Sequence, residues 1–232
     1  MPLVQTDAEV TVCTLVYREP RWIDWWKEGL TQAKTETRYR TLVLANDPEP
    51  KVRESECWDV SLANSDPAAH YLGRVYNAWN ECMMIAPTEL VVLTNSDMFM
   101  SDYWLDELME CKRQKPKSLP CSLLVENGRI PSGMPEYVKD FGTNPADFRA
   151  ADFRTLASTL RKRGTYEPGR LFQPALFDRQ SFLDIGPYTS NQGDKSGDRI
   201  LFEKYQAEGW EWVTCKGSVV SHLQEGEKRW NP

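Results

Sequence analysis

The sequence predicts an α/β fold in a single domain, with a mostly parallel sheet covered by helices on both faces. Two observations favour this class. Apolar, β-branched segments alternate with segments whose apolar residues recur at helical spacing, and this alternation is typical of a parallel sheet. The chain has 232 residues and is 41% hydrophobic, so one domain with a sizeable core is expected.

The first half of the chain supplies most of this pattern. Pro48 and Pro87 each stop a preceding element, because proline lacks the backbone donor that a continuing helix or strand needs. The expected strands are Val10–Tyr17, Thr41–Ala45, Cys57–Leu62 and a segment beginning at Leu90, and the expected helices are Trp22–Leu30 and Tyr71–Ala86.

Three polar residues, Asn95, Ser96 and Asp97, interrupt the apolar segment Leu90–Met100. We expect a buried strand that ends at these residues and a helix that opens near Ser101. A carboxylate at the carboxyl end of a parallel strand is well placed to bind a metal ion or phosphate. The alternative is that the three residues only cap the following helix.

Other polar residues are expected at the same edge of the sheet, because right-handed crossovers bring the carboxyl ends of parallel strands together. The first strand ends at Tyr17 and is followed closely by Glu19, and the second ends at Asn46 and Asp47. These side chains are far from Asp97 in sequence, yet the topology predicts that they face a common site.

The second half of the chain is less regular. Residues 127–144 are rich in glycine and proline and predict a long loop of the kind that often serves as a lid or a binding loop. Asn144 or Asp147 is a candidate N-cap for the helix that follows. The other expected elements are strands at Ser118–Val125, at Leu171–Phe177 and within Trp210–Val220, a helical turn at Arg179–Ile185, a loop at Gly186–Gly197, and helices at Asp147–Arg163 and Asp198–Glu208.

Charge and cysteine usage exclude several classes. The net charge is -6 without a dominant basic block, which disfavours a protein that grips nucleic acid through its phosphates. The six cysteines form no CxxC pair and predict reduced thiols in a cytoplasmic protein rather than a zinc site or a disulfide framework. No apolar run is long enough to span a membrane.

From Val10 to about Gly226 the chain resembles the family 2 inverting glycosyltransferases of the GT-A fold. The resemblance rests on five features in order. They are Tyr17-Arg18-Glu19 after the first strand, Asn46-Asp47 after the second, the helix segment Gly73–Ala86 with Arg74 and Asn80, Asn95-Ser96-Asp97 in place of the family's Asp-x-Asp motif, and finally Gly197–Leu201 together with Val220-Ser221-His222.

The resemblance implies a metal-dependent transfer of a sugar from a nucleotide-diphosphate sugar, with UDP the expected nucleotide. A divalent cation, Mn²⁺ or Mg²⁺, would stabilise the departing diphosphate as a Lewis acid. Asp97 is the expected metal ligand and His222 the residue that completes the metal shell. Asn95 departs from the family's first Asp but keeps an acceptor oxygen. The donor is expected to contact Tyr17, Glu19, Asn46, Asp47, Arg74, Asn80 and Asn95.

Inversion requires a general base that takes the proton of the acceptor hydroxyl. Asp198 matches the family's base, although an Asp at a helix start is also an ordinary N-cap. Asp194, four residues earlier, is the rival base. Residues 1–100 are expected to bind the nucleotide and residues 101–232 the acceptor. The acceptor is a glycan, a lipid-linked sugar, a protein or a modified nucleobase.

Two other functions fit the same layout. A sugar nucleotidyltransferase also uses a carboxylate-bound metal, but it usually carries a glycine-rich basic loop after its first strand. Residues 14–22 contain no glycine, which counts against this class. A non-catalytic nucleotide- or carbohydrate-binding module is the second alternative. This alternative is supported by Asn95 and by the Gly-Asp-Arg sequence at 197–199, where the family commonly has a Glu-Asp pair.

Overall fold

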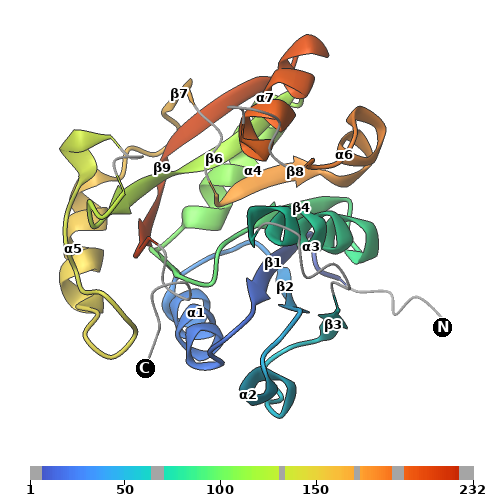
Figure 1. Ribbon diagram of the computed structural model, residues 1–232. Helices are drawn as coiled ribbons and strands as arrows, with labels where there is room; N and C mark the ends of the chain where they lie inside the picture. The colour runs from blue at the N-terminus through green and yellow to red at the C-terminus, as the bar shows by residue number, and fades with distance from the viewer. Residues whose placement is uncertain (1–6, 64–70, 131–133, 170–172, 190–195, 225–232) are drawn as a thin grey trace.

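The computed structural model describes residues 7–63, 71–130, 134–169, 173–189 and 196–224. Figure 1 shows one sheet with helices packed on both of its faces. The strands are β1 (Val10–Val16), β2 (Tyr39–Asn46), β3 (Val60–Leu62), β4 (Leu90–Leu93), β5 (Met98–Met100), β6 (Ser118–Glu126), β7 (Tyr166–Pro168), β8 (Ala175–Asp178) and β9 (Glu211–His222). The helices are α1 (Arg21–Gln32), α2 (Pro50–Arg53), α3 (Tyr71–Ile85), α4 (Trp104–Gln114), α5 (Ala150–Leu160), α6 (Arg179–Ile185) and α7 (Gly197–Ala207), with a 3₁₀ turn η1 at Pro135–Tyr137.

The nine-stranded sheet runs in the order β3-β2-β1-β4-β8-β6-β9-β5, with β7 also pairing with β9. Strands β3, β2, β1 and β4 are parallel, as the sequence predicts. β8 is antiparallel to both of its neighbours, and β6 and β9 are again parallel to each other. The predicted α/β class is confirmed, and each antiparallel pair includes at least one strand from the second half of the chain.

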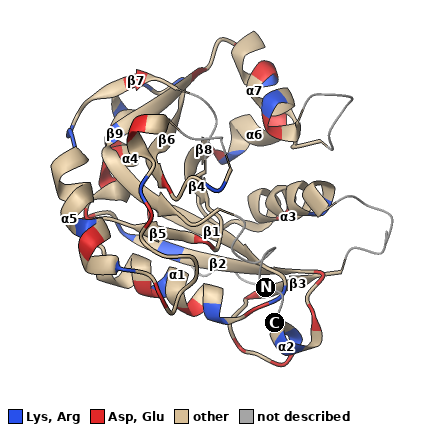
Figure 2. Cartoon of the chain, turned by 60° about the vertical axis from the view of Figure 1, so that its left-hand side comes forward, with Lys and Arg blue, Asp and Glu red and all other residues tan. Residues whose placement is uncertain are grey.

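The two faces of the sheet carry separate apolar cores, as expected for parallel strands buried on both sides. On β1, the side chains of Val10, Val12 and Val16 pack with α1 and α4. Cys13, which has the opposite orientation, packs with α3, α6 and α7. In Figure 2, acidic and basic residues are interspersed over the outer helices, including α1, α5 and α7.

The polar residues after β4 lead into another strand and not into a helix. β5 begins directly after Asp97 and pairs with the end of β9 at the far edge of the sheet. Helix α4 starts later, at Trp104, and its N-cap is Tyr103. The capping alternative for residues 95–97 is therefore wrong, because these residues connect a central strand to an edge strand.

Close packing of α1 on β5 requires a small residue at Gly29. A Cβ atom on Gly29 would lie 3.0 Å from the ring of Phe99. The glycine thus lets the helix approach the strand that follows Asp97.

Several predicted elements need correction. Helix α5 is shorter than predicted, and its N-cap Arg149 makes no side-chain capping bond. Asp147 instead accepts hydrogen bonds from the backbone N–H groups of Thr143 and Asn144, so it closes a turn before the helix. The third strand comprises only residues 60–62, and α2 and β7 were not predicted. Part of the predicted strand 171–177 lies outside the described residues.

No helix in the described part of the chain combines the length and the apolar composition needed to cross a membrane.

A buried hydrogen-bond node fixes the chain just before Asn95. Thr94 is fully buried; its Oγ1 donates to the carbonyl oxygen of Cys13 at 3.0 Å and accepts from the Nε1–H of Trp26 at 2.9 Å. Its backbone N–H also donates to the Cys13 carbonyl, at 2.9 Å. The node joins α1, β1 and the end of β4.

We predict that Thr94→Val lowers the free energy of unfolding by about 1–3 kcal/mol, because it leaves the buried indole N–H of Trp26 without an acceptor. Thr94→Ser keeps the hydroxyl and should lose about 1 kcal/mol or less, from one methyl group. Chemical denaturation of both variants and the wild type checks this. Equal losses in the two variants would contradict the role given to the hydroxyl.

Candidate functional site

Asp97 and His222 meet because β5 pairs with the end of β9. Met98 lies opposite His222 in the antiparallel register, and the backbone N–H of Leu223 donates to the carbonyl oxygen of Asp97 at 3.0 Å. The Nε2 atom of His222 is 3.5 Å from Oδ1 of Asp97. Both side chains are largely buried, with 15% of His222 and 9% of Asp97 exposed. The structure thus brings the two predicted metal ligands together.

A third charged residue, Glu126, completes this group and was missed in the sequence. It is the last residue of β6, lies opposite His222 in the parallel register, and is 3% exposed. Its Oε1 is 3.0 Å from Nδ1 of His222. The sequence could have indicated Glu126, because it directly follows a predicted buried strand. The same criterion had identified Asn46 and Asp97.

The environment of His222 favours its charged form. Burial of the ring lowers its pKa, but the adjacent carboxylates of Asp97 and Glu126 outweigh this effect and raise the pKa of His222 to about 9. A cation that binds Nε2 must displace the proton there, so metal binding at this site releases a proton.

Three of the residues predicted to contact the donor form a second group. Arg74, from α3, makes an ion pair of 3.1 Å with Asp47, and its guanidinium lies 5.8 Å from the ring centre of Tyr17. Asp47 follows β2 directly and has a positive φ of 50°, a conformation that Asp tolerates better than most residues. The neighbouring Asn46 is buried and Asn95 is half-buried. Tyr17, Asp47 and Arg74 are therefore brought together as predicted.

Glu19 is an anchor of the local fold. Its carboxylate is buried and contacts Nζ of Lys51 at 2.5 Å and Nε of Arg21 at 3.3 Å. Burial raises its pKa, but the hydrogen bonds from Lys51 and Arg21 outweigh this and lower the pKa below its usual value. These contacts tie the loop after β1 to α1 and α2, and a direct contact with a donor stays a prediction.

Asn80 makes two hydrogen bonds with one residue of a neighbouring loop. Its Nδ2 donates to the carbonyl oxygen of Tyr188 and its Oδ1 accepts from the Tyr188 N–H, each at 2.9 Å. Tyr188 in turn stacks on Tyr76, with ring centres 5.2 Å apart. Asn80 thus positions the chain that leads toward α7, and its contact with a donor also stays a prediction.

Asp198 lies in the first turn of α7 and is not the N-cap of that helix. Ser196 is the N-cap, because its Oγ accepts from the N–H of Arg199. The hydroxyl of Tyr76 donates to Oδ2 of Asp198 at 3.1 Å. Burial raises the pKa of Asp198 and exceeds the lowering by Tyr76, which favours a carboxylate that can take up a proton. Asp194, the rival base, lies outside the described residues.

The donor set suits a cation that is shared with a ligand. Within the described residues, no group of three His, Cys, Asp or Glu side chains is arranged to hold a metal ion alone. Asp97 and His222 supply two adjacent donors. Mg²⁺ in particular is commonly bound by one or two protein carboxylates together with substrate phosphates and water.

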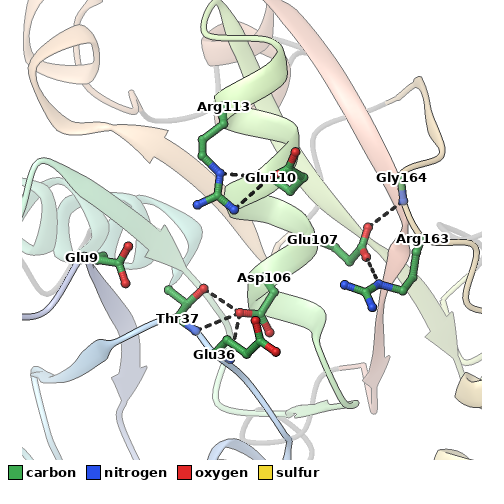
Figure 3. Close-up of a pocket in the computed structure, with 9 residues that line it drawn as sticks. All are labelled: Glu9, Glu36, Thr37, Asp106, Glu107, Glu110, Arg113, Arg163 and Gly164. Atoms are coloured by element: carbon green, nitrogen blue, oxygen red, sulfur yellow. Dashed lines mark hydrogen bonds and ion pairs between the residues drawn. The ribbon is translucent and has the colours of Figure 1, made fainter.

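A separate hollow of about 480 Å³ lies at the other end of the parallel strands, near the start of β1 and β2. Figure 3 shows that Glu107 and Glu110 from α4 are paired with Arg163 and Arg113, and that Asp106 accepts from Thr37. The carboxylates of α4 in this hollow are thus paired, and none of the predicted site residues lines it.

Comparison with known proteins supports the fold. No protein-family model and no curated protein matches the sequence. Among solved structures, the chain is similar to GalNAc-T7 crystallised with UDP, GalNAc and Mn²⁺, with a TM-score of 0.64 and 10% sequence identity. The match covers 94% of this chain and 44% of GalNAc-T7, so the chain spans less than half the length of that protein.

The protonation of His222 gives a pH-dependent stability. A group whose pKa is higher in the folded state stabilises it at low pH, so the contribution of His222 should be complete below pH 6.5 and lost as the pH rises to about 9. Its upper limit is about 3 kcal/mol. We predict that the difference in free energy of unfolding between wild type and His222→Gln, measured with a chelator present, shrinks across this range. A difference that stays constant from pH 6 to 10 would contradict it.

The chain therefore has a fold of the GT-A type, in which an Asp–His–Glu group and an Arg–Asp–Tyr group lie at the carboxyl ends of the strands.

Proposed function

We propose that this protein transfers a sugar from a nucleotide-diphosphate sugar, expected to be a UDP-sugar, to an acceptor hydroxyl with inversion. The observation that carries the proposal is the contact of Asp97 with His222 at the carboxyl edge of a GT-A-type sheet. The GalNAc-T7 structure with UDP and Mn²⁺ supports the choice of nucleotide and cation. A family 2 assignment rests on the ordered motifs of the sequence.

The group of Tyr17, Asp47 and Arg74 is proposed to bind the nucleotide and its diphosphate. Tyr17 and Asp47 would border the base and ribose, with Asn46 and Asn95 beside them. Arg74 is held by Asp47 through one Nη, while its buried Nε has no hydrogen-bond partner within the described chain. That N–H suits a phosphate oxygen, because Arg binds phosphate through planar N–H groups.

Asp97 and His222 are the residues proposed to hold Mn²⁺ or Mg²⁺. When bound, the cation would supply Lewis-acid stabilisation of the diphosphate. Asp97 would bind the cation through its carboxylate. His222 would contribute Nε2 after losing its proton.

Asp198 is the proposed general base. The acceptor oxygen forms the new bond to the anomeric carbon while the bond from that carbon to the diphosphate breaks, and the proton of the acceptor hydroxyl passes to Asp198. Tyr76 holds the carboxylate at the start of α7, and burial favours proton uptake. Asp194 remains the alternative base. The half formed by residues 101–232 would bind the acceptor, whether a glycan, a lipid-linked sugar, a protein or a modified nucleobase.

We predict Mn²⁺-dependent hydrolysis of UDP-sugars by the purified protein, and a loss of about 100-fold or more in Asp97→Ala and Asp198→Asn. Asp198→Asn should still bind UDP with Mn²⁺, because the base does not hold the donor. Asp184→Asn, on the exposed surface of α6, is the matched control and should keep wild-type activity.

The alternatives give different results. UDP binding without turnover of any donor would favour a non-catalytic binding module. Formation of a nucleotide sugar from a sugar phosphate and a nucleoside triphosphate would favour a nucleotidyltransferase. Near-wild-type turnover in Asp198→Asn would move the base to Asp194.

A further inference from the structure

Glu126 is held rigidly beside His222. Its carbonyl oxygen accepts from the N–H of Lys139 at 2.8 Å, and the next residue, Asn127, donates through Nδ2 to the carbonyl oxygen of Leu223 at 2.6 Å. These bonds fix the chain on both sides of the Glu126–His222 contact. The side chain is 3% exposed, so its charge is little screened by water.

The contact selects one orientation of the imidazole ring. Oε1 of Glu126 lies 3.0 Å from Nδ1, and a carboxylate at this distance accepts a hydrogen bond from the N–H of that nitrogen. With Nδ1 carrying hydrogen, the other nitrogen, Nε2, is the one that can donate a lone pair to a cation. Nε2 is the atom that faces Asp97.

We propose that Glu126 is a positioning residue of the cation site, which fixes the Nδ1–H form and the orientation of His222 so that Nε2 and Asp97 bind the same ion. This inference rests on the proposed function, and neither the motifs nor the resemblance gives Glu126 a part in it. A carboxylate behind a ligating histidine also increases the donor strength of the ring.

The charges support the same role, because Glu126 places a second carboxylate 3.0 Å from Nδ1 of His222, on the other side of the ring from the nitrogen that faces Asp97.

The test measures Mn²⁺ binding in the presence of UDP, from the loss of the free-ion EPR signal. We expect Glu126→Ala to weaken Mn²⁺ binding about 10–100-fold, as loss of such a partner typically does. Glu126→Gln should lose less, because its carbonyl oxygen still accepts from Nδ1–H. Glu110→Ala, which removes a half-buried glutamate paired with Arg113 on α4, is the matched control and should bind like wild type.

A second readout separates positioning from a general effect on folding. The chain has two histidines, so long-range ¹H–¹⁵N spectra of ¹⁵N-histidine-labelled protein with Mg²⁺ and UDP can be assigned with a His222→Gln sample. Wild type should show His222 with hydrogen on Nδ1 only, and Glu126→Ala should show a loss of that single form. Circular dichroism confirms that each variant is folded.

The outcomes are distinguishable. If His222→Ala loses Mn²⁺ binding while Glu126→Ala keeps it, the part given to Glu126 is wrong and the proposed function stands. If wild type itself binds no Mn²⁺ with UDP, the part given to Glu126 and the proposed function are both wrong. If Glu126→Ala does not fold, Glu126→Gln decides: the inference predicts a smaller but measurable loss of Mn²⁺ affinity in that variant, and wild-type affinity overturns it.

Discussion

The site depends on the pairing of a three-residue strand, β5, with the last three residues of β9. β9 is 12 residues long and holds β6 along one edge, while β5 and β7 occupy opposite ends of its other edge. Because the register sets Met98 and Glu126 on either side of His222, residues about 100 positions apart in sequence meet at one ring. Any slip of one residue would turn these side chains to the opposite face.

The charged residues at the carboxyl ends of the strands divide into one ion-paired group that orders a loop and the groups proposed to bind the donor and its cation. Glu19 is neutralised by Lys51 and Arg21, and this pair orders the loop after β1. The ring of His222 contacts the carboxylates of both Asp97 and Glu126. Carboxylates beside an imidazole favour a cation, and the Arg74 side chain beside Tyr17 favours an anion. A metal–diphosphate complex provides both the cation and the anion.

Much of the fold could be predicted from the sequence because local patterns determine it. The apolar, β-branched run in β1 and the helical spacing in α3 each follow from burial, and the strand ends then indicated Asn46, Asp47 and Asp97 as neighbours at one edge of the sheet. The pairing of β5 could not be predicted, since three apolar residues after a polar turn have no periodicity. Glu126 was missed for a related reason, because its partner is set by the register of β6 against β9. The hydrogen bonds of Asn80 with Tyr188 depend on a loop conformation that no local pattern encodes.

The most direct test of the account is a crystal structure with UDP and Mn²⁺, in which the anomalous signal locates the ion. The account predicts Mn²⁺ bonded to a carboxylate oxygen of Asp97, to Nε2 of His222 and to the diphosphate, with the base beside Tyr17 and Asp47. An ion bound elsewhere, such as in the acidic hollow beside Asp106, would contradict it. So would a bound nucleotide with no ion at Asp97 and His222.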